Sequence, residues 1–249
     1  MPDEQPIRPA ATVMILRDAA PSFEVFMLRR TNRAVFAGGM YVFPGGRVDA
    51  ADHGDDYASA CVDPGAGQAL QQQALGERWR GFWVAGIREC FEEAGLLLAY
   101  RKDGSLLDFA DPEEHARIDA YRTPLHAGEL TLLEICQREN LRLALDHIHF
   151  VTRVVTPPGR PRRFDTRFFM AEAPAGQTGR HDGHETVDSV WISPDAALAR
   201  HADDDFGLMS VTHRQLRDLS EHGSKGAALE SAAARETFTV SRPRRAATD

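Results

Sequence analysis

Residues 84–96, with the sequence VAGIRECFEEAGL, constrain the fold of this chain more than any other segment. A helical step of about 100° per residue places the apolar side chains on one core-facing stripe: Val84, Ile87, Phe91 and Ala94. The same step gathers three carboxylates nearly opposite that stripe, on the side expected to be exposed: Glu89, Glu92 and Glu93. Gly95 follows where a left-handed C-terminal cap would end the helix. The segment therefore predicts an amphipathic helix with a concentrated acidic face.

The clustered carboxylates destabilise such a helix. Like charges three or four residues apart repel by roughly 0.2–0.5 kcal/mol per pair. Glu92 and Glu93 also lie in the last turn, where the helix dipole disfavours anions by about 0.3–1 kcal/mol. Two interpretations follow: a solvated acidic face, or a site for a hard divalent cation that prefers oxygen ligands and neutralises the repulsion. Arg88, one turn before Glu92, could pair with it and orient it.

The loop upstream favours the cation site. Residues 43–46 read Phe-Pro-Gly-Gly, which excludes a regular helix and predicts a tight bend. A glycine at position 46 lets its backbone carbonyl approach an ion closely and supply a further oxygen ligand.

Gly46, Asp52 and the run from Arg88 to Leu96 together resemble the Nudix box, G-x5-E-x7-R-E-U-x-E-E-x-G-U, in which U is a bulky aliphatic residue. Cys90 stands at the first aliphatic position after the arginine, and Asp52 stands where the family has glutamate. Between Asp52 and Arg88 lie 35 residues, where the pattern has seven. An insertion at this point is characteristic of the acyl-coenzyme A diphosphatase subgroup. The segments FPGGRVDAAD, RRFDTRFF and VWISPDAAL also resemble that subgroup.

The resemblance implies a Nudix α/β/α sandwich with a mixed sheet and added helices. It implies that Mg²⁺ or Mn²⁺ is held by Glu89, Glu92, Glu93 and the Gly46 carbonyl, with Arg88 as an orienting residue. Bound metals would shield the charge of a diphosphate and acidify the attacking water. The general base stays open between Glu89 and Glu93 within the box and Glu185 outside it.

The leading hypothesis for the substrate is coenzyme A or an acyl-coenzyme A, cleaved to 3′,5′-ADP and a 4′-phosphopantetheine product. Alternatives are an ADP-ribose or dinucleotide diphosphatase and, in another class, a non-catalytic Nudix-like nucleotide-binding module. The upstream motif of coenzyme A hydrolases is only partly matched, because Val35 stands at its arginine position. Candidate substrate contacts are Arg29, Arg33, Phe36 and Arg163, although surface arginines are more often solvated or ion-paired.

Composition narrows the class of protein. The formal net charge of -8 argues against a broad nucleic-acid surface, so a polyanionic small molecule must be bound by metal or clustered arginines. No apolar run approaches the roughly 20 residues that span a bilayer, and the first residues lack a secretory signal. The three cysteines form no disulfide or metal pattern. We therefore expect a cytoplasmic protein without nucleic-acid or membrane partners.

We expect one domain over residues 1–240, with an insertion at 53–80, a helical insertion at about 103–145 and a disordered tail at 241–249. The added helices could serve as homodimer contacts. Patterning predicts strands at 11–17, 23–30, 96–100, 147–156, 164–173 and 187–192. It predicts helices at about 71–94, two between 112 and 140, one beginning at Ser193 and Pro194, and a last one at 211–222.

Overall fold

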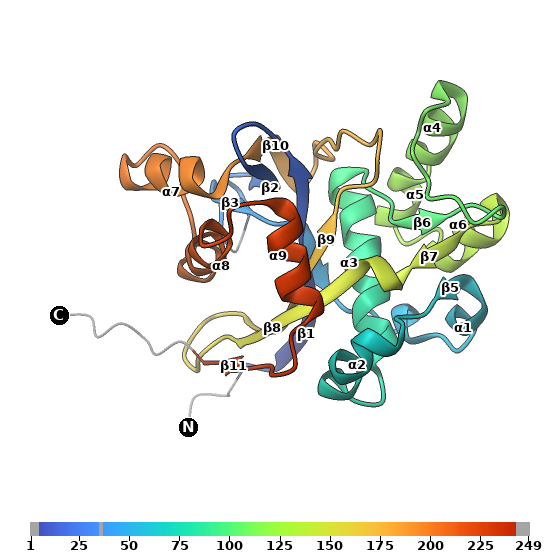
Figure 1. The fold of residues 1–249 in the computed structure, drawn as a ribbon, viewed down its shortest axis with the longest axis horizontal. Coiled ribbons are helices and arrows are strands. Elements are labelled where there is room, and N and C mark those ends of the chain that lie inside the picture. The colour runs from blue at the N-terminus through green and yellow to red at the C-terminus, as the bar shows by residue number, and fades with distance from the viewer. Residues whose placement is uncertain (1–4, 35–36, 243–249) are drawn as a thin grey trace.

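The computed structural model describes residues 5–34 and 37–242 (Figure 1). Its centre is a mixed eight-stranded sheet, in which β10, β2, β1, β9, β8 and β11 lie in this order and β3 and β4 pair with β2 and β1. The longer strands are β1 (Ile7–Asp18), β2 (Phe23–Arg30), β8 (Ile148–Val155), β9 (Arg163–Glu172) and β10 (Thr186–Ile192). The short ones are β3 (Tyr41–Val42), β4 (Gly45–Arg47) and β11 (Val240–Ser241). The strands predicted at 11–17 and 23–30 are confirmed as β1 and β2, which pair antiparallel with Leu16 opposite Val25.

Helices cover both faces of this sheet, as Figure 1 shows. One face packs on α3 (Trp79–Ala94), and the other on α7 (Pro194–Ala202), α8 (Ser210–Ser220) and α9 (Lys225–Ala233). Strand alternation explains the division, because successive side chains of a strand point to opposite faces. In β1, Val13 and Ile15 join the core around α3, whereas Met14 and Leu16 join the core under α7–α9. The expected α/β/α sandwich is confirmed.

The two predicted insertions meet in a second, smaller sheet. Its strands are β5 (Cys61–Val62), β7 (Arg142–Ala144) and β6 (Ala99–Tyr100), with β7 in the middle. Around it lie η1 (Ala51–His53), α1 (Tyr57–Ala60), η2 (Ala66–Gln68), α2 (Ala69–Leu75), α4 (Pro112–Asp119), α5 (Arg122–His126), α6 (Leu132–Glu139) and η3 (Leu145–His147). The insertion expected at 53–80 contributes Tyr57 and Cys61 to the α3 core.

Several boundaries differ from the pattern-based prediction. The helix expected at 71–94 is divided into α2 and α3 at Gly76, which has a φ of 81°. Three helices, α4 to α6, replace the two expected between residues 112 and 140, and α9 was not predicted. Ser241, placed in the expected tail, pairs in β11 with Val154, and residues 243–249 lie outside the described part of the chain. The Gly95 cap is confirmed, with a φ of 67° in the left-handed region.

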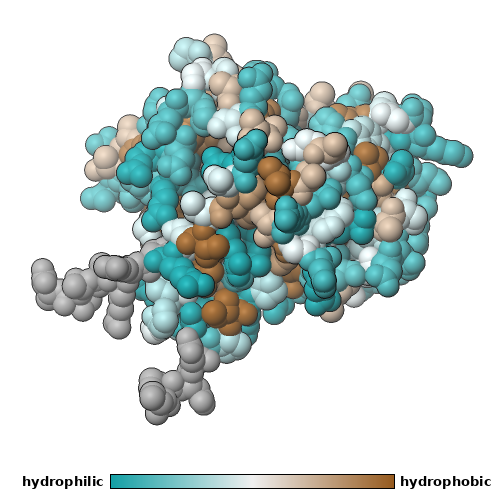
Figure 2. All heavy atoms as spheres, turned by 60° about the horizontal axis from the view of Figure 1, so that its bottom comes forward, coloured by the Kyte–Doolittle hydropathy of each residue, from teal (hydrophilic) through white to brown (hydrophobic). Residues whose placement is uncertain are grey.

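The surface seen in Figure 2 is mainly hydrophilic, with apolar side chains in small, separated groups. The exposed large apolar residues of the described chain come from different elements: Ile7, Leu70, Leu106, Val187 and Val240. Within the described residues, every helix is too short or too polar to cross a membrane.

Candidate active site

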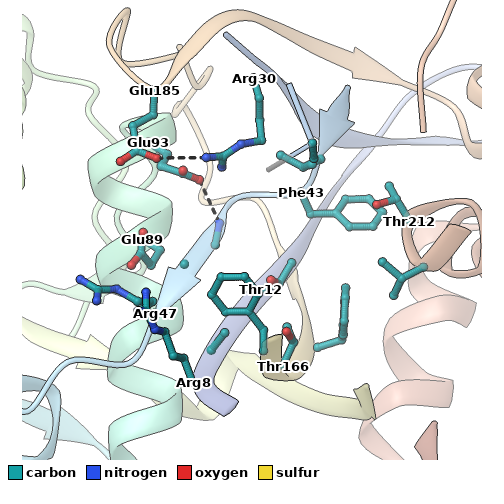
Figure 3. A pocket seen from close by; sticks show the side chains of 18 of the residues that line it. Arg8, Thr12, Arg30, Phe43, Arg47, Glu89, Glu93, Thr166, Glu185 and Thr212 are labelled. Carbon is teal, nitrogen blue, oxygen red and sulfur yellow. Dashed lines mark hydrogen bonds and ion pairs between the residues drawn. The ribbon is translucent and has the colours of Figure 1, made fainter. Parts of the chain in front are cut away.

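A cavity of about 510 Å³ lies beside the sheet, bordered by β1, β4, α3, the β8–β9 region and the start of α8 (Figure 3). Its size falls in the range of small-molecule sites, roughly 300–1,000 Å³. The residues of the Nudix box that line it are Gly46, Arg88, Glu89, Glu92 and Glu93, and Glu185 lines it from the segment before β10. The structure thus brings every predicted catalytic and metal-ligating residue to one cavity.

Glu92 and Glu93 are buried and Glu89 is partly buried, contrary to the exposure expected from helical periodicity. Glu92 and Glu93 are 9% and 5% exposed, and the Glu89 side chain is 12% exposed. The cause is tertiary: β4 of the main sheet, η1 and α5 all contact α3. The acidic face therefore borders an enclosed site instead of bulk solvent, and the interpretation as a simple solvated face was wrong.

Arg88 is the centre of a buried ion-pair network. Its Nε and Nη2 donate to the two carboxylate oxygens of Asp52 at 2.9 and 3.0 Å, a bidentate arrangement. Its Nη1 donates to Glu89 at 2.9 Å and to Glu92 at 3.0 Å. Asp52 is 1% exposed and also accepts a hydrogen bond from the Asp49 backbone N–H. Asp52 therefore pairs with Arg88 despite the long insertion between them.

The glycine bend brings backbone against the acidic side chains. The Gly45 N–H donates to Glu93 Oε2 at 3.0 Å, as Figure 3 shows. A Cβ placed on Gly46 would lie 2.5 Å from Glu89 Oε1, closer than side chains tolerate. Position 46 consequently requires glycine if Glu89 is to keep its place.

Electrostatics mark these carboxylates as unusual. Burial raises the pKa of Glu89 against the opposing charge of Arg88, and burial together with the charge of Glu89 raises the pKa of Glu93 well above its ordinary range. Burial also raises the pKa of Glu92, again against Arg88. One arginine thus faces more negative charge than it can neutralise, including that of its closest partner, Asp52.

This surplus of negative charge is what a divalent cation would neutralise. Mg²⁺ and Mn²⁺ prefer oxygen ligands. Because residue 46 is glycine, no side chain at this position separates the β4 backbone from the Glu89 carboxylate. Among the described residues, no three acidic, histidine or cysteine side chains already converge as a coordination group. Glu89 and Glu92 are held by Arg88, and Glu93 is held by Gly45. The residues therefore fit the ion by their chemistry and burial.

Arg29 and Arg30 are consecutive residues of β2, and only one of them faces the cavity. Arg30 lines the cavity and its Nη2 lies 3.4 Å from Glu185, whereas Arg29, a predicted substrate contact, does not line it. Arg29 instead pairs in register with Tyr41 and Asp188, whose side chains share a hydrogen bond. Consecutive residues of a strand point to opposite faces, so only one of the two can face the glutamates.

The other predicted substrate residues also lie away from the described cavity wall. Arg33 is exposed on the turn after β2 and is not among the lining residues. Arg163 is 6% exposed and donates from Nε to the Thr156 carbonyl at 3.2 Å. Phe36 lies outside the described residues.

Several lining residues were missed, and most follow a signal present in the sequence. The even-numbered residues of β1 and β9 line the cavity together: Arg8, Ala10, Thr12, Phe164, Thr166 and Phe168. Period-two alternation, applied with the motif, would have selected them. Arg47, His126 and the α8 residues Val211 and Thr212 also line it, and only the packing of separate segments reveals them.

Comparison with known proteins agrees with this geometry. The chain is 29% identical to the acyl-coenzyme A diphosphatase NUDT19 of Gallus gallus, over 87% of this chain and 69% of that protein. It is 24% identical to the Homo sapiens protein of the same name, over 82% of this chain and 62% of that protein. The Xenopus laevis relative is 24% identical, over 71% of this chain and 54% of that protein. The chain thus spans about half to two thirds of the length of these relatives.

A solved structure shares the fold of this chain, and the match covers nearly the full length of both chains. The crystal structure of a NUDIX hydrolase from Alicyclobacillus acidocaldarius matches with a TM-score of 0.73 and 27% sequence identity, covering 91% of this chain and 96% of that one. The family model described as the NUDT19 Nudix domain matches residues 66–219. Since that match extends over more than half of the sequence, the chain belongs to the NUDT19 Nudix domain family of Nudix hydrolases.

Proposed function

We propose that this protein is a metal-dependent diphosphatase that cleaves coenzyme A or acyl-coenzyme A to 3′,5′-ADP and a 4′-phosphopantetheine product. One observation carries the proposal: Glu89, Glu92 and Glu93 line one wall of the same cavity, with Glu92 and Glu93 buried and the Gly45–Gly46 bend against them. The names of the three curated relatives supply the substrate class.

The cavity suits a substrate with a charged centre and apolar arms. The diphosphate belongs at the glutamates, where a bound Mg²⁺ or Mn²⁺ would shield its charge and lower the pKa of an attacking water. Gly46, Glu89, Glu92 and Glu93 are the proposed ligands. Away from the glutamates, apolar side chains offer contacts for the uncharged parts of the substrate: Phe43, Val154, Phe168, Met209 and Val211.

The chain's own residues divide the remaining tasks. Arg88 orients Glu89 and Glu92 through its two Nη1 hydrogen bonds, and Asp52 holds Arg88. The proton acceptor for water is Glu89, Glu93 or Glu185, all of which line the cavity. Arg30, which points toward Glu185 and Glu93 in Figure 3, is a charged donor for a phosphate oxygen.

Substrate assays test the proposal. The purified chain is incubated with Mg²⁺ or Mn²⁺ and, separately, with coenzyme A, an acyl-coenzyme A, ADP-ribose and a dinucleoside polyphosphate, and the products are identified by mass spectrometry. We expect 3′,5′-ADP from the coenzyme A substrates and no product with a chelator present. Preferential cleavage of ADP-ribose or of the dinucleotide, with coenzyme A left intact, would replace the proposed substrate class.

A substitution separates catalysis from mere binding. Glu93→Gln keeps the size of the side chain but removes its charge, and we expect turnover to fall while the substrate still binds. The matched control is Glu77→Gln, at an exposed glutamate before α3 that does not line the cavity. If the wild-type chain bound coenzyme A without cleaving it under any metal condition, the non-catalytic binding module would be the correct class.

The expected cytoplasmic location and homodimer stay predictions. Cys61, Cys90 and Cys136 are free thiols in the structure, as in a reducing compartment. Cell fractionation tests the location, and light scattering of the purified chain tests the oligomeric state.

A further inference from the structure

Three arginines border the same cavity as the glutamates and have no acidic partner among the described residues. Arg8 comes from β1, Arg47 from β4 and Arg162 from the turn before β9, and all three line the cavity and are exposed. No ion pair joins any of them to a carboxylate within the described chain, in contrast to Arg88, Arg101 and Arg153. In a chain with a formal net charge of -8, three guanidinium groups that line one cavity without a counterion in the described part of the chain need an explanation.

The topology brings these arginines together from distant parts of the sequence. Arg8 pairs in register with Phe164, two residues after Arg162, and Ala10, two residues after Arg8, pairs with Arg47. Arg8 and Phe164 therefore share one sheet face, the face that lines the cavity. Figure 3 shows Arg8 and Arg47 along the cavity edge near Glu89.

The acidic residues that follow Arg47 and Arg162 in the sequence, Asp49 and Asp165, are directed elsewhere. Asp165 points to the opposite face of β9, where it pairs with Arg153 at 2.7 Å and Arg167 at 2.9 Å. The Asp49 carboxylate, which follows β4, lies 3.7 Å from Arg88 Nη2. Within the described residues, the three arginines therefore have no carboxylate partner and can bind an anion brought by a ligand.

We propose that Arg8, Arg47 and Arg162 form a second anion subsite, which binds a phosphate monoester on the nucleoside arm of the substrate. This arginine subsite is separate from the diphosphate position at Glu89, Glu92 and Glu93. Arginine favours phosphate because its planar guanidinium donates two parallel hydrogen bonds. Phe164 is half-buried, pairs in register with Arg8 and lines the same cavity, so its ring is an aromatic surface for the attached base.

The inference rests on the proposed function and makes it more specific. In coenzyme A the 3′-phosphate and the 5′-diphosphate are attached to the same ribose, so a ligand anchored at the glutamates carries its second phosphate within reach of the cavity edge. The arginine subsite would therefore distinguish coenzyme A from 3′-dephospho-coenzyme A, whose diphosphate is identical.

The test compares these two substrates. For the wild-type chain we expect kcat/KM for coenzyme A to exceed that for 3′-dephospho-coenzyme A by about tenfold or more. Arg8→Ala and Arg162→Ala should each lower this ratio severalfold, and the double variant should bring it close to one. The matched control is Arg160→Ala, an exposed arginine of the same β8–β9 connection that does not line the cavity, and it should leave the ratio unchanged.

Binding provides a readout that does not depend on turnover. Calorimetry with adenosine 3′,5′-bisphosphate and with AMP should show tighter binding of the bisphosphate to the wild-type chain, and Arg8→Ala with Arg162→Ala should remove the difference. Equal affinity for the two nucleotides, or an equal loss in Arg160→Ala, would overturn the arginine subsite. If coenzyme A were not cleaved but the bisphosphate still bound selectively, the proposed function would fail and the arginine subsite would stand.

Discussion

Asp52→Ala tests the ion-pair network that supports the site. Asp52 is 1% exposed and provides both oxygens to Arg88 at 2.9 and 3.0 Å, and it also accepts the Asp49 N–H. Removing one partner of a buried pair costs about 3–5 kcal/mol. Arg88 keeps Glu89 and Glu92 as partners, so we expect the lower end, a loss of about 3 kcal/mol in the free energy of unfolding.

The matched control is Asp49→Ala. The Asp49 side chain is 53% exposed and 3.7 Å from Arg88, and such exposed pairs contribute about 0–1 kcal/mol. Urea unfolding, followed by the fluorescence of buried Trp83 in the presence of a chelator, measures both variants. At about 2–4 °C per kcal/mol, Asp52→Ala should also lower Tm by roughly 6–12 °C. If the two variants differed by less than about 1 kcal/mol, the structural role assigned to Asp52 would be refuted.

Four further outcomes are expected. Gly46→Ala should lower kcat/KM by about 100-fold, since the new methyl group displaces the Glu89 carboxylate. The free energy of unfolding of this variant should change little, because the displaced group is the end of a flexible side chain. Unchanged activity would contradict the close contact between position 46 and Glu89. Glu93→Gln should lower kcat by about 100-fold or more, whereas Glu77→Gln should match wild type. Saturating Mn²⁺ at about 100 times Kd should stabilise the fold by about 2.7 kcal/mol, and no shift of Tm, compared with a chelator, would argue against the metal site. Burial raises the pKa of Cys61 and of Cys136 to about 12, so a thiol reagent at pH 8 should label them only after unfolding; rapid labelling of the native chain would show that these thiols are accessible.

The sequence by itself determined the local features of the site. Helical periodicity and the Gly95 cap located α3, and the spacing of Glu89, Glu92 and Glu93 predicted that they share a face. These features depend on residues within a few positions of one another, which a linear pattern contains. Alternation in β1 and β9 also carries the information that Arg8 and Phe164 share a face, once the two strands are known to pair.

Only the tertiary structure decided what surrounds that face. Burial of Glu92 and Glu93 depends on the contacts of β4, η1 and α5 with α3. The ion pair of Asp52 with Arg88 joins two residues that are separated in the sequence by the insertion. The arginines of the second anion subsite come from three separated segments. Such contacts depend on strand register and on the packing of distant elements, because loop closure across tens of residues leaves no periodic signal in the sequence.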